Sequence, residues 1–153
     1  MKLDAIDYQI LKLMQEDANI TNKEIAAKTG LTITPIYERV KKLNSYGILK
    51  NKVYLLDRKK IGLNLMALVS ISLNQHMKEN VNFFVKEISK HPEVVECFHL
   101  TGKSDFQLKI YVKDMDEYQK FMINKLSSIN NIAHIESYFV MSEIKNTTSL
   151  PVF

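Results

Sequence analysis

The chain has 153 residues, which is enough for one ordinary domain or two very small ones. Hydrophobic residues make up 46% and charged residues 25%, with only 4 Gly and 3 Pro, a composition that excludes collagen-like, disordered and linker-dominated chains. Residues 1–60 carry 12 basic and 7 acidic side chains, a net charge of +5, whereas residues 61–153 carry 9 and 10, a net charge of −1. This asymmetry predicts a first part that binds a polyanion and a second part with another task.

Cysteine content and apolar runs predict the compartment. The single cysteine, Cys97, excludes an internal disulfide, and the chain opens on charged residues rather than on an apolar signal segment. The longest apolar run, 65–73, contains serines and is far shorter than the roughly 20 residues of a membrane-spanning helix. These features predict a cytoplasmic protein without a membrane segment.

Two short helices are predicted first. Asp4 is a suitable N-cap for a helix whose apolar positions recur with the 3.6-residue period of one buried stripe. Those positions are Ile6, Ile10, Leu13 and Met14. Thr21 and Glu24 then form a capping-box pattern that begins a second helix. Gly30 ends that helix at the position where a left-handed residue is favoured.

A third helix is predicted from Thr32, its N-cap, with Pro35 in the first turn, where a missing amide hydrogen costs no hydrogen bond. Its apolar stripe consists of Ile36, Val40 and Leu43. Gly47 ends the helix. Alternating residues around Val53 and Leu55 then predict a strand that leads out of the first domain.

A short helix, a tight turn and a basic third helix together predict a helix-turn-helix. A recognition helix places the compact or polar residues of its first turns, here Thr34 and Glu38, against base edges, while basic residues further along reach phosphates. The candidate DNA-binding residues are Thr32, Thr34, Pro35, Tyr37, Glu38, Arg39, Lys41 and Lys42. A generic three-helix bundle has the same periodicities, but the charge asymmetry and the turn over 30–32 favour DNA binding.

Residues 61–64 are the expected joint between a DNA-binding domain over 1–60 and a second domain over 65–153. Beyond the joint, the hydrophobic period changes repeatedly between that of strands and that of helices. The predicted elements are a strand over 65–73, a helix over 79–90, strands over 94–101 and 105–113, a helix opened by a capping box at Asp114 and Glu117, and a strand over about 133–144. The first of these helices is expected to bury Val81, Phe84, Val85 and Ile88.

The order βαββαβ predicts a ferredoxin-like sandwich for the second domain. Together with the preceding winged-helix-like helix-turn-helix, this makes the chain an α+β protein. Two helices cover only one face of a four-stranded sheet. The other face is expected to carry Cys97, His99, Phe139 and Met141 or their alternates. Such a face is too apolar to stay in water, so a second copy of the sheet is expected to pack on it and form a homodimer. Two-fold symmetry suits a palindromic DNA site, since paired recognition helices lie about 34 Å apart.

A co-linear series of short motifs runs through both halves of the chain. In the first half these are Leu3-Asp4-x-x-Asp7-x-x-Ile10-Leu11, Gln15-Glu16-Asp17, Gly30-Leu31-Thr32, Glu38-Arg39-Val40-Lys41-Lys42-Leu43 and Tyr46-Gly47-Ile48. In the second half they are Gly102-Lys103-Ser104-Asp105-Phe106 and the stretch Tyr138-Phe139-Val140-Met141-Ser142-Glu143-Ile144-Lys145. Over about residues 3–151, this series resembles the Lrp/AsnC family, the leucine-responsive or feast/famine transcriptional regulators. Thr34-Pro35 and Glu96-Cys97 are similar to the leucine-responsive members.

The resemblance implies a sequence-specific, DNA-binding transcriptional regulator whose assembly and DNA binding respond to a free amino acid. It implies that the second domain forms dimers, assembles them into octamers and binds the amino acid between dimers. The implied effector-binding residues are Thr101, Gly102, Lys103, Ser104, Asp105, Tyr138 and Val140. Backbone groups around Gly102 are expected to contact the effector, and Asp105 to bind its ammonium group.

From the residues alone, this turn has a plainer interpretation. Gly102 is then an ordinary hairpin glycine and Asp105 a residue that bonds its own turn. Phe106 stands where the family more often has Tyr. Lys103 either favours an effector carboxylate or points to solvent, the usual place of a turn lysine.

The sequence gives no support to an enzyme. The glycines at 30, 47, 62 and 102 lie at element ends, so neither a dinucleotide fingerprint nor a phosphate-binding loop can be written. The four histidines lack metal-ligand spacing, and Cys97 has no neighbouring base. We expect no catalytic residue, no metal and no cofactor besides the effector.

Two other functions stay open at this point. One is a nucleoid-organising protein with weak sequence preference. The other is an amino-acid-sensing regulatory subunit of a metabolic enzyme, which would have no need of the basic third helix.

Overall fold

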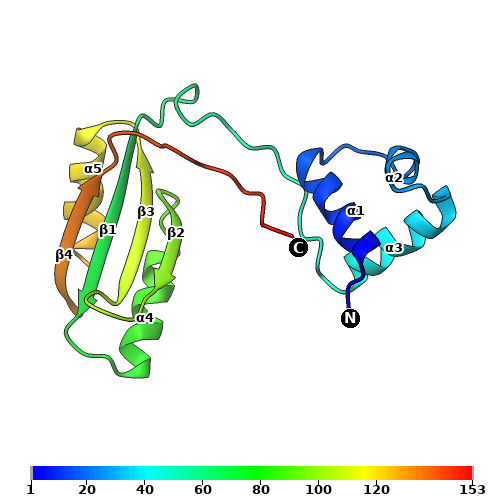
Figure 1. Ribbon diagram of the computed structural model, residues 1–153. Coiled ribbons are helices and arrows are strands. Elements are labelled where there is room, and N and C mark those ends of the chain that lie inside the picture. Colours follow the sequence, from blue (N-terminus) through cyan, green and yellow to red (C-terminus); the bar gives the residue numbers. More distant parts are fainter. Residues whose placement is uncertain (1, 153) are drawn as a thin grey trace. The chain divides into compact units, whose positions relative to one another are not determined.

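The chain divides into two compact units (Figure 1). The computed structural model describes residues 2–152. The first unit combines Met1–Leu55 with Lys145–Phe153, and the second spans Leu56–Ile144. The two ends of the chain therefore belong to the same unit.

Residues 61–64, the expected joint, lie inside the second unit rather than between the two. The Leu63 N–H donates to the Arg58 carbonyl oxygen at 2.8 Å, and the Arg58 guanidinium donates to the Leu63 carbonyl oxygen at 2.9 Å. The same guanidinium forms an ion pair with Glu143 at 2.8 Å. A turn bonded in this way is part of the folded unit, so the boundary moves to Leu55/Leu56.

The first unit contains the three predicted helices, which bury their apolar stripes in one core. They are α1 (Ala5–Glu16), α2 (Asn22–Thr29) and α3 (Ile33–Ser45). The core consists of Ile10, Leu11, Ile25, Ala26, Ile36 and Leu43. Thr21 and Glu24 form the predicted capping box, and Gly30 takes the left-handed conformation with φ 71° at the end of α2.

The N-terminus of α3 differs from the prediction in one detail. Thr32 lies at the N-cap, but its side chain makes no capping hydrogen bond. Such a bond would come from the N–H of the second or third helical residue. The third is Pro35, which has no N–H. The Thr32 side chain is exposed.

The strand predicted around Val53 and Leu55 is not present. Within the described chain, residues 50–57 form neither helix nor strand. Val53, Tyr54 and Leu55 are 68%, 91% and 71% exposed. Alternation of side chains predicts a strand only if a neighbouring strand accepts its backbone hydrogen bonds, and this segment has no such neighbour in the single chain.

The C-terminal segment returns to the first unit, which the sequence did not predict. The Gln15 side-chain amide donates to the Leu150 carbonyl oxygen at 3.0 Å and accepts the Leu150 N–H at 2.7 Å. Val152 packs against the helical core. One side chain of α1 thus pairs with the backbone of the tail as a neighbouring strand would.

The second unit is the predicted βαββαβ arrangement. Its elements are β1 (Leu65–Leu73), α4 (Lys78–Ile88), β2 (Val94–His99), β3 (Phe106–Val112), α5 (Met115–Phe121) followed by a π-helical turn η1 (Met122–Leu126), and β4 (Ile132–Phe139). The strands form one antiparallel sheet in the order β2-β3-β1-β4. Each crossover helix therefore joins two strands that are separated by a third, as the split βαβ arrangement requires.

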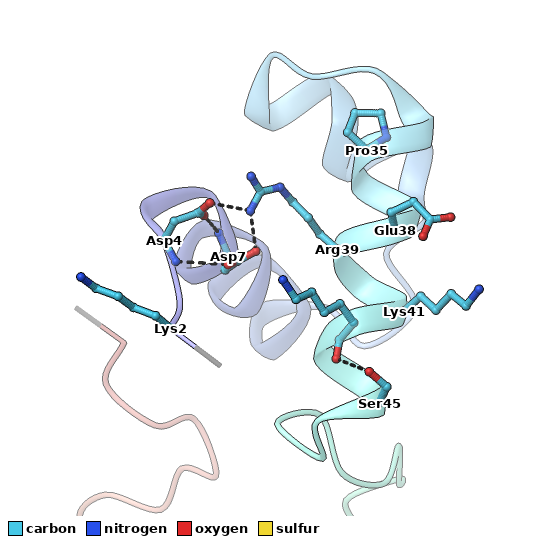
Figure 2. A pocket seen from close by; sticks show the side chains of 9 residues that line it. Lys2, Asp4, Asp7, Pro35, Glu38, Arg39, Lys41 and Ser45 are labelled. Atoms are coloured by element: carbon cyan, nitrogen blue, oxygen red, sulfur yellow. Dashed lines mark hydrogen bonds and ion pairs between the residues drawn. The ribbon is translucent and has the colours of Figure 1, made fainter.

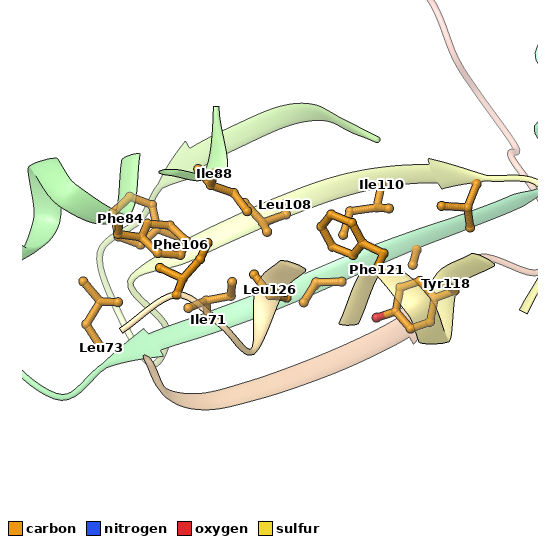
Figure 3. Close-up of a cluster of buried hydrophobic side chains, with 14 residues drawn as sticks. Ile71, Leu73, Phe84, Ile88, Phe106, Leu108, Ile110, Tyr118, Phe121 and Leu126 are labelled. Carbon is orange, nitrogen blue, oxygen red and sulfur yellow. The ribbon is translucent and has the colours of Figure 1, made fainter. Parts of the chain in front are cut away.

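One face of the sheet and both helices enclose the core of this unit (Figure 3). The buried residues of β3 alternate along the strand as its sequence predicted, and those of β1 do so over 67–73, but Met66 on the other face is buried as well. The largest buried side chains here are Ile71, Phe84, Ile88, Phe106, Leu108, Ile110, Phe121 and Leu126. The expected inward position of Val85 is wrong, since this side chain is 40% exposed.

The open face of the sheet is less apolar than predicted. Cys97 pairs with Leu108 and His99 with Phe106, so both lie on the helix-covered side. The reason is a bulge between Val94 and Glu96, because one extra residue moves every later side chain of β2 to the opposite face.

The last strand shows the same reversal of faces. Phe139 pairs with Ala67 on the covered side and lies 5.0 Å from the Tyr118 ring. Met141 lies beyond the end of β4, fully exposed. The open face combines Met66, Leu68, Phe98 and Tyr138 with polar residues such as Ser70, Gln107 and Glu136. Its composition therefore does not by itself require a second sheet.

The capping box predicted at Asp114 and Glu117 is half formed. The Asp114 carboxylate accepts the Glu117 N–H at 3.0 Å. The Glu117 carboxylate instead accepts a hydrogen bond from Lys120 at 2.8 Å. A cation one turn further along the helix thus takes the side chain that would have completed the box.

Candidate functional site

The outer face of α3 carries most of the predicted DNA-binding residues. Thr34, Tyr37, Glu38 and Lys41 follow one another at the spacing of a single helix face, and all four are exposed. Thr32 and Lys42 are also exposed, whereas Pro35 is half-buried. Thr34, Tyr37 and Glu38 lie in the first two turns of α3, and Lys41 and Lys42 follow in the third.

Arg39 is the exception, because its charge is already matched inside the unit. Its Nη1 lies 2.7 Å from a carboxylate oxygen of Asp4 and 2.7 Å from one of Asp7. Figure 2 shows Arg39 extending toward the start of α1, while Glu38 and Lys41 extend away from it. Arg39 therefore joins α3 to α1 through Nη1, while its side chain stays 31% exposed.

The two carboxylates that hold Arg39 also cap α1. The Asp7 N–H donates to Asp4 at 2.9 Å, and the Asp4 N–H donates to Asp7 at 3.1 Å. The Asp7 backbone N–H and the Arg39 guanidinium hold the pKa of Asp4 below its ordinary value. The same hydrogen bonds, to Asp4 and then Asp7, raise the pKa of Arg39. Asp4 and Arg39 therefore stabilise the ionised form of each other.

A groove of about 620 Å³ runs beside this cluster on the α3 side. Its lining consists of Lys2, Asp4, Asp7, Pro35, Glu38, Arg39, Lys41, Lys42 and Ser45. Lys2, Lys41 and Lys42 make no ion pair among residues 2–152. The sequence analysis did not include Lys2 among the candidate DNA-binding residues. Its position two residues before Asp4, the N-cap of α1, places it in the groove lining.

In the second unit, the predicted effector turn lies at one end of the central strands. The Asp105 N–H donates to the Ile71 carbonyl oxygen, and the Asp105 carbonyl oxygen accepts the Leu100 N–H, both at 2.8 Å. Its carboxylate accepts the Leu73 N–H at 2.7 Å and lies 2.9 Å from His76 Nε2. The sequence analysis missed His76, which lies 29 residues before its partner.

The turn is centred on Gly102, whose φ of 124° lies in the region that favours a residue without a side chain. Thr101 and Lys103 are exposed, and Ser104 is half-buried. The Lys103 carbonyl oxygen accepts a long hydrogen bond of 3.5 Å from the Ser72 hydroxyl group.

Tyr138 and Val140 lie elsewhere on the sheet. Tyr138 pairs with Leu68, and the Val140 N–H donates to the Met66 carbonyl oxygen at 3.0 Å. The turn lies beside Ile71, three residues further along β1, which corresponds to roughly 10 Å. One copy of the chain therefore does not bring these two residues together with the turn.

The described part of the chain supports neither a metal site nor a cysteine nucleophile nor a membrane-spanning helix. Over residues 2–152, no group of three or more His, Cys, Asp or Glu side chains could hold a metal ion. Burial raises the pKa of the Cys97 thiol, which opposes a nucleophilic role. None of the described helices is both long and apolar enough to span a bilayer.

Comparison with protein families assigns both halves of the chain. A family of winged helix-turn-helix DNA-binding domains matches residues 3–50, and the Lrp/AsnC ligand binding domain matches residues 66–150. The transcriptional regulator AzlB of Bacillus subtilis is 39% identical over 150 residues, covering 98% of this chain and 96% of that protein. The transcriptional activator DecR of Escherichia coli is 38% identical, covering 98% and 99%.

Solved structures agree with this assignment. A transcriptional regulator from Neisseria meningitidis, crystallised as an L-Met complex, superposes with a TM-score of 0.92 at 35% identity, covering 98% of this chain and 97% of that one. AsnC of Escherichia coli superposes with a TM-score of 0.91 at 24% identity, covering 99% and 100%. The second likeness bears on the fold alone.

Proposed function

Because this chain belongs to the Lrp/AsnC family of transcriptional regulators, we propose that it reads specific DNA sites with α3 and that a free amino acid bound to its second unit changes this binding. The chain carries a helix-turn-helix and a ligand-binding domain of that family. We place the regulator in the cytoplasm and expect it to act without enzymatic activity.

The observation that carries the DNA-binding role is the exposed face of α3. Thr34, Tyr37 and Glu38 occupy its first turns, and Lys41 and Lys42 follow without ion pairs among the described residues. This order supports base reading by the first group and phosphate binding by the second. Thr32 adds an exposed hydroxyl group at the N-cap.

The effector role is supported by the ligand-binding family match and by the L-Met complex of the Neisseria regulator. In the proposed site, Asp105 binds the α-ammonium group, and backbone groups of Thr101, Gly102, Lys103 and Ser104 bind the carboxylate. Lys103 is an exposed turn lysine.

Assembly completes the proposal. We propose a homodimer that assembles further into octamers. Tyr138 and Val140 lie too far from the turn to join it within one copy, so their place in an effector site requires a neighbouring copy. Analytical ultracentrifugation tests this assembly, and a monomer at micromolar concentration would contradict it.

Two experiments test the function. Thermal unfolding is measured with each of the twenty amino acids, beginning with L-methionine, since a ligand at 100 times its Kd adds about 2.7 kcal/mol of stability. Selection from random DNA is then run with the parent, Thr34→Ala and Glu38→Ala. We expect the two variants to select altered sites, and an unchanged site would remove these residues from base reading.

A further inference from the structure

Both oxygens of the Asp105 carboxylate already have a partner within the chain. Oδ2 accepts the Leu73 N–H at 2.7 Å, and Oδ1 lies 2.9 Å from His76 Nε2. The Leu73 N–H belongs to the backbone of β1 and cannot leave without disturbing the sheet. The His76 side chain is 65% exposed, against 20% for Asp105, so water can replace Asp105 as its partner.

The loop that carries His76 is held firmly just before it. Asn131 accepts the Gln75 N–H at 3.0 Å through its side-chain oxygen and donates to the Gln75 carbonyl oxygen at 2.9 Å. The Asn131 carbonyl oxygen accepts the Asn74 N–H at 2.8 Å. With the backbone fixed and the imidazole exposed, rotation about the side-chain bonds of His76 is enough to release Asp105.

We propose that His76 is a gate residue of the effector site, which occupies Asp105 Oδ1 without ligand and is displaced by the α-ammonium group of a free amino acid. This inference rests on the proposed function, in which Asp105 binds that ammonium group. Each carboxylate oxygen can accept two hydrogen bonds, so the competition is for space: the imidazole lies against Oδ1, the oxygen that the β1 backbone does not hold, where an ammonium group would approach. The measured affinity for the amino acid is therefore the intrinsic affinity multiplied by the fraction of molecules in which His76 has left the site.

Competition makes amino-acid binding depend on pH. Histidine ordinarily gains its charge between about pH 8 and pH 5, and a charged donor bonds a carboxylate more strongly than a neutral one. A positively charged imidazole therefore competes better for a carboxylate than a neutral one, and we expect amino-acid affinity to fall as the pH falls through this range. The charged or titratable groups on the surrounding segments are Lys103 on the turn, Lys78 and Glu79 at the start of α4, His99 on β2 and His134 on β4.

The test uses the full-length protein and the twenty free L-amino acids as probes. A thermal-shift screen at about pH 8 and about pH 5.5 identifies those that bind. Calorimetry then measures the Kd of the tightest at both pH values for the parent, His76→Ala, His76→Gln and the control His134→Gln. The control removes an imidazole from β4 and leaves His76 in place.

We expect the parent to bind about two- to fivefold more weakly at the lower pH, the size of an exposed ion pair. Both His76 variants should bind at least as tightly as the parent and lose the pH dependence, whereas His134→Gln should keep it. Weaker binding by His76→Ala at both pH values would show that His76 contacts the amino acid, which overturns the gate. A pH-independent parent, or a pH dependence lost in His134→Gln, overturns it as well.

The two proposals fail in different ways. If no amino acid stabilises the parent at either pH, the proposed effector function fails and the gate falls with it. If an amino acid binds but the His76 variants match the parent, only the gate is overturned.

Discussion

Each unit of this regulator holds a carboxylate against a basic side chain, and the two arrangements differ in what can be released. In the first unit, Arg39 lies between Asp4 and Asp7, and the Asp7 side chain is only 5% exposed. Removing the cation would leave a buried carboxylate with only the Asp4 N–H as its partner, which is costly. In the second unit, His76 makes one contact to Asp105 from the solvent side. Water compensates for the loss of such a contact.

This difference teaches that residue type and motif position do not decide whether a charge is available to a ligand. Arg39 lies on the predicted recognition helix, yet its partners within the unit occupy it. Lys41 and Lys42 on the same helix make no ion pair among the described residues. The same reasoning makes Asp105 available, because its competing partner is exposed.

The largest expected effect is on stability in the first unit. Arg39→Met should lower the free energy of unfolding by about 2 to 3 kcal/mol, because the buried Asp7 carboxylate loses its cation. Urea denaturation followed by circular dichroism measures this. Lys41→Met is the matched control, an exposed cation on the same helix, and should change stability by no more than about 0.5 kcal/mol. Equal losses in the two variants would contradict the distinction.

Asp105→Asn should weaken amino-acid binding about tenfold to a hundredfold, because a charge-assisted bond is worth roughly 1.5 to 3 kcal/mol. The carboxamide oxygen can still accept the Leu73 N–H, so the fold should persist. Calorimetry gives the Kd, and DNA affinity without effector should stay within about threefold of the parent. Asp114→Asn, at the N-cap of α5, is the control and should bind the amino acid normally. Normal binding by Asp105→Asn would exclude it as the ammonium partner.

A smaller effect separates Arg39 from its neighbours in DNA binding. Removing a side chain that binds one phosphate should reduce the slope of log K against log salt by about 0.9. Fluorescence anisotropy with the selected DNA should show this decrease for Lys2→Ala, Lys41→Ala and Lys42→Ala. Arg39→Gln, which removes the cation, and the exposed α1 control Lys12→Ala should keep the parent slope. A decrease for Arg39→Gln as large as that for Lys42→Ala would return Arg39 to the phosphate-binding set.

The smallest effect concerns Asp4 and acid. The pKa of Asp4 is held below its ordinary value by the Asp7 N–H and Arg39, so its ionised form stabilises the folded state. That contribution is complete above the ordinary aspartate pKa and is lost as the pH falls through the lowered value. Asp4→Asn should therefore be less stable than the parent at neutral pH, and the two should converge in acid. If the stability difference did not change with pH, the charge of Asp4 would not be its cause.

The faces of the sheet show how far a pattern can be followed. Alternation predicted the buried residues of β3 and those of β1 over 67–73, since both strands lie at the centre of the sheet. On the edge strand β2, the bulge after Val94 moved Cys97 and His99 to the covered face. A period of two defines two faces, but a single extra residue exchanges them, and nothing in the local sequence marked that residue.

The sequence by itself determined the order of the elements, the capped starts and glycine ends of the short helices, and the family to which the turn and the recognition helix belong. These are local properties, because helix caps, periods and turns depend on residues a few positions apart. Only the tertiary structure decided that Arg39 binds Asp4 and Asp7, that His76 holds Asp105, and that the tail pairs with Gln15. Those partners lie 35, 32, 29 and 135 residues apart, and no local rule selects among the many side chains able to make such contacts. Which charges are left for DNA and for the effector follows from these long-range pairings, since a group bound within the fold must leave its partner before it can bind a ligand.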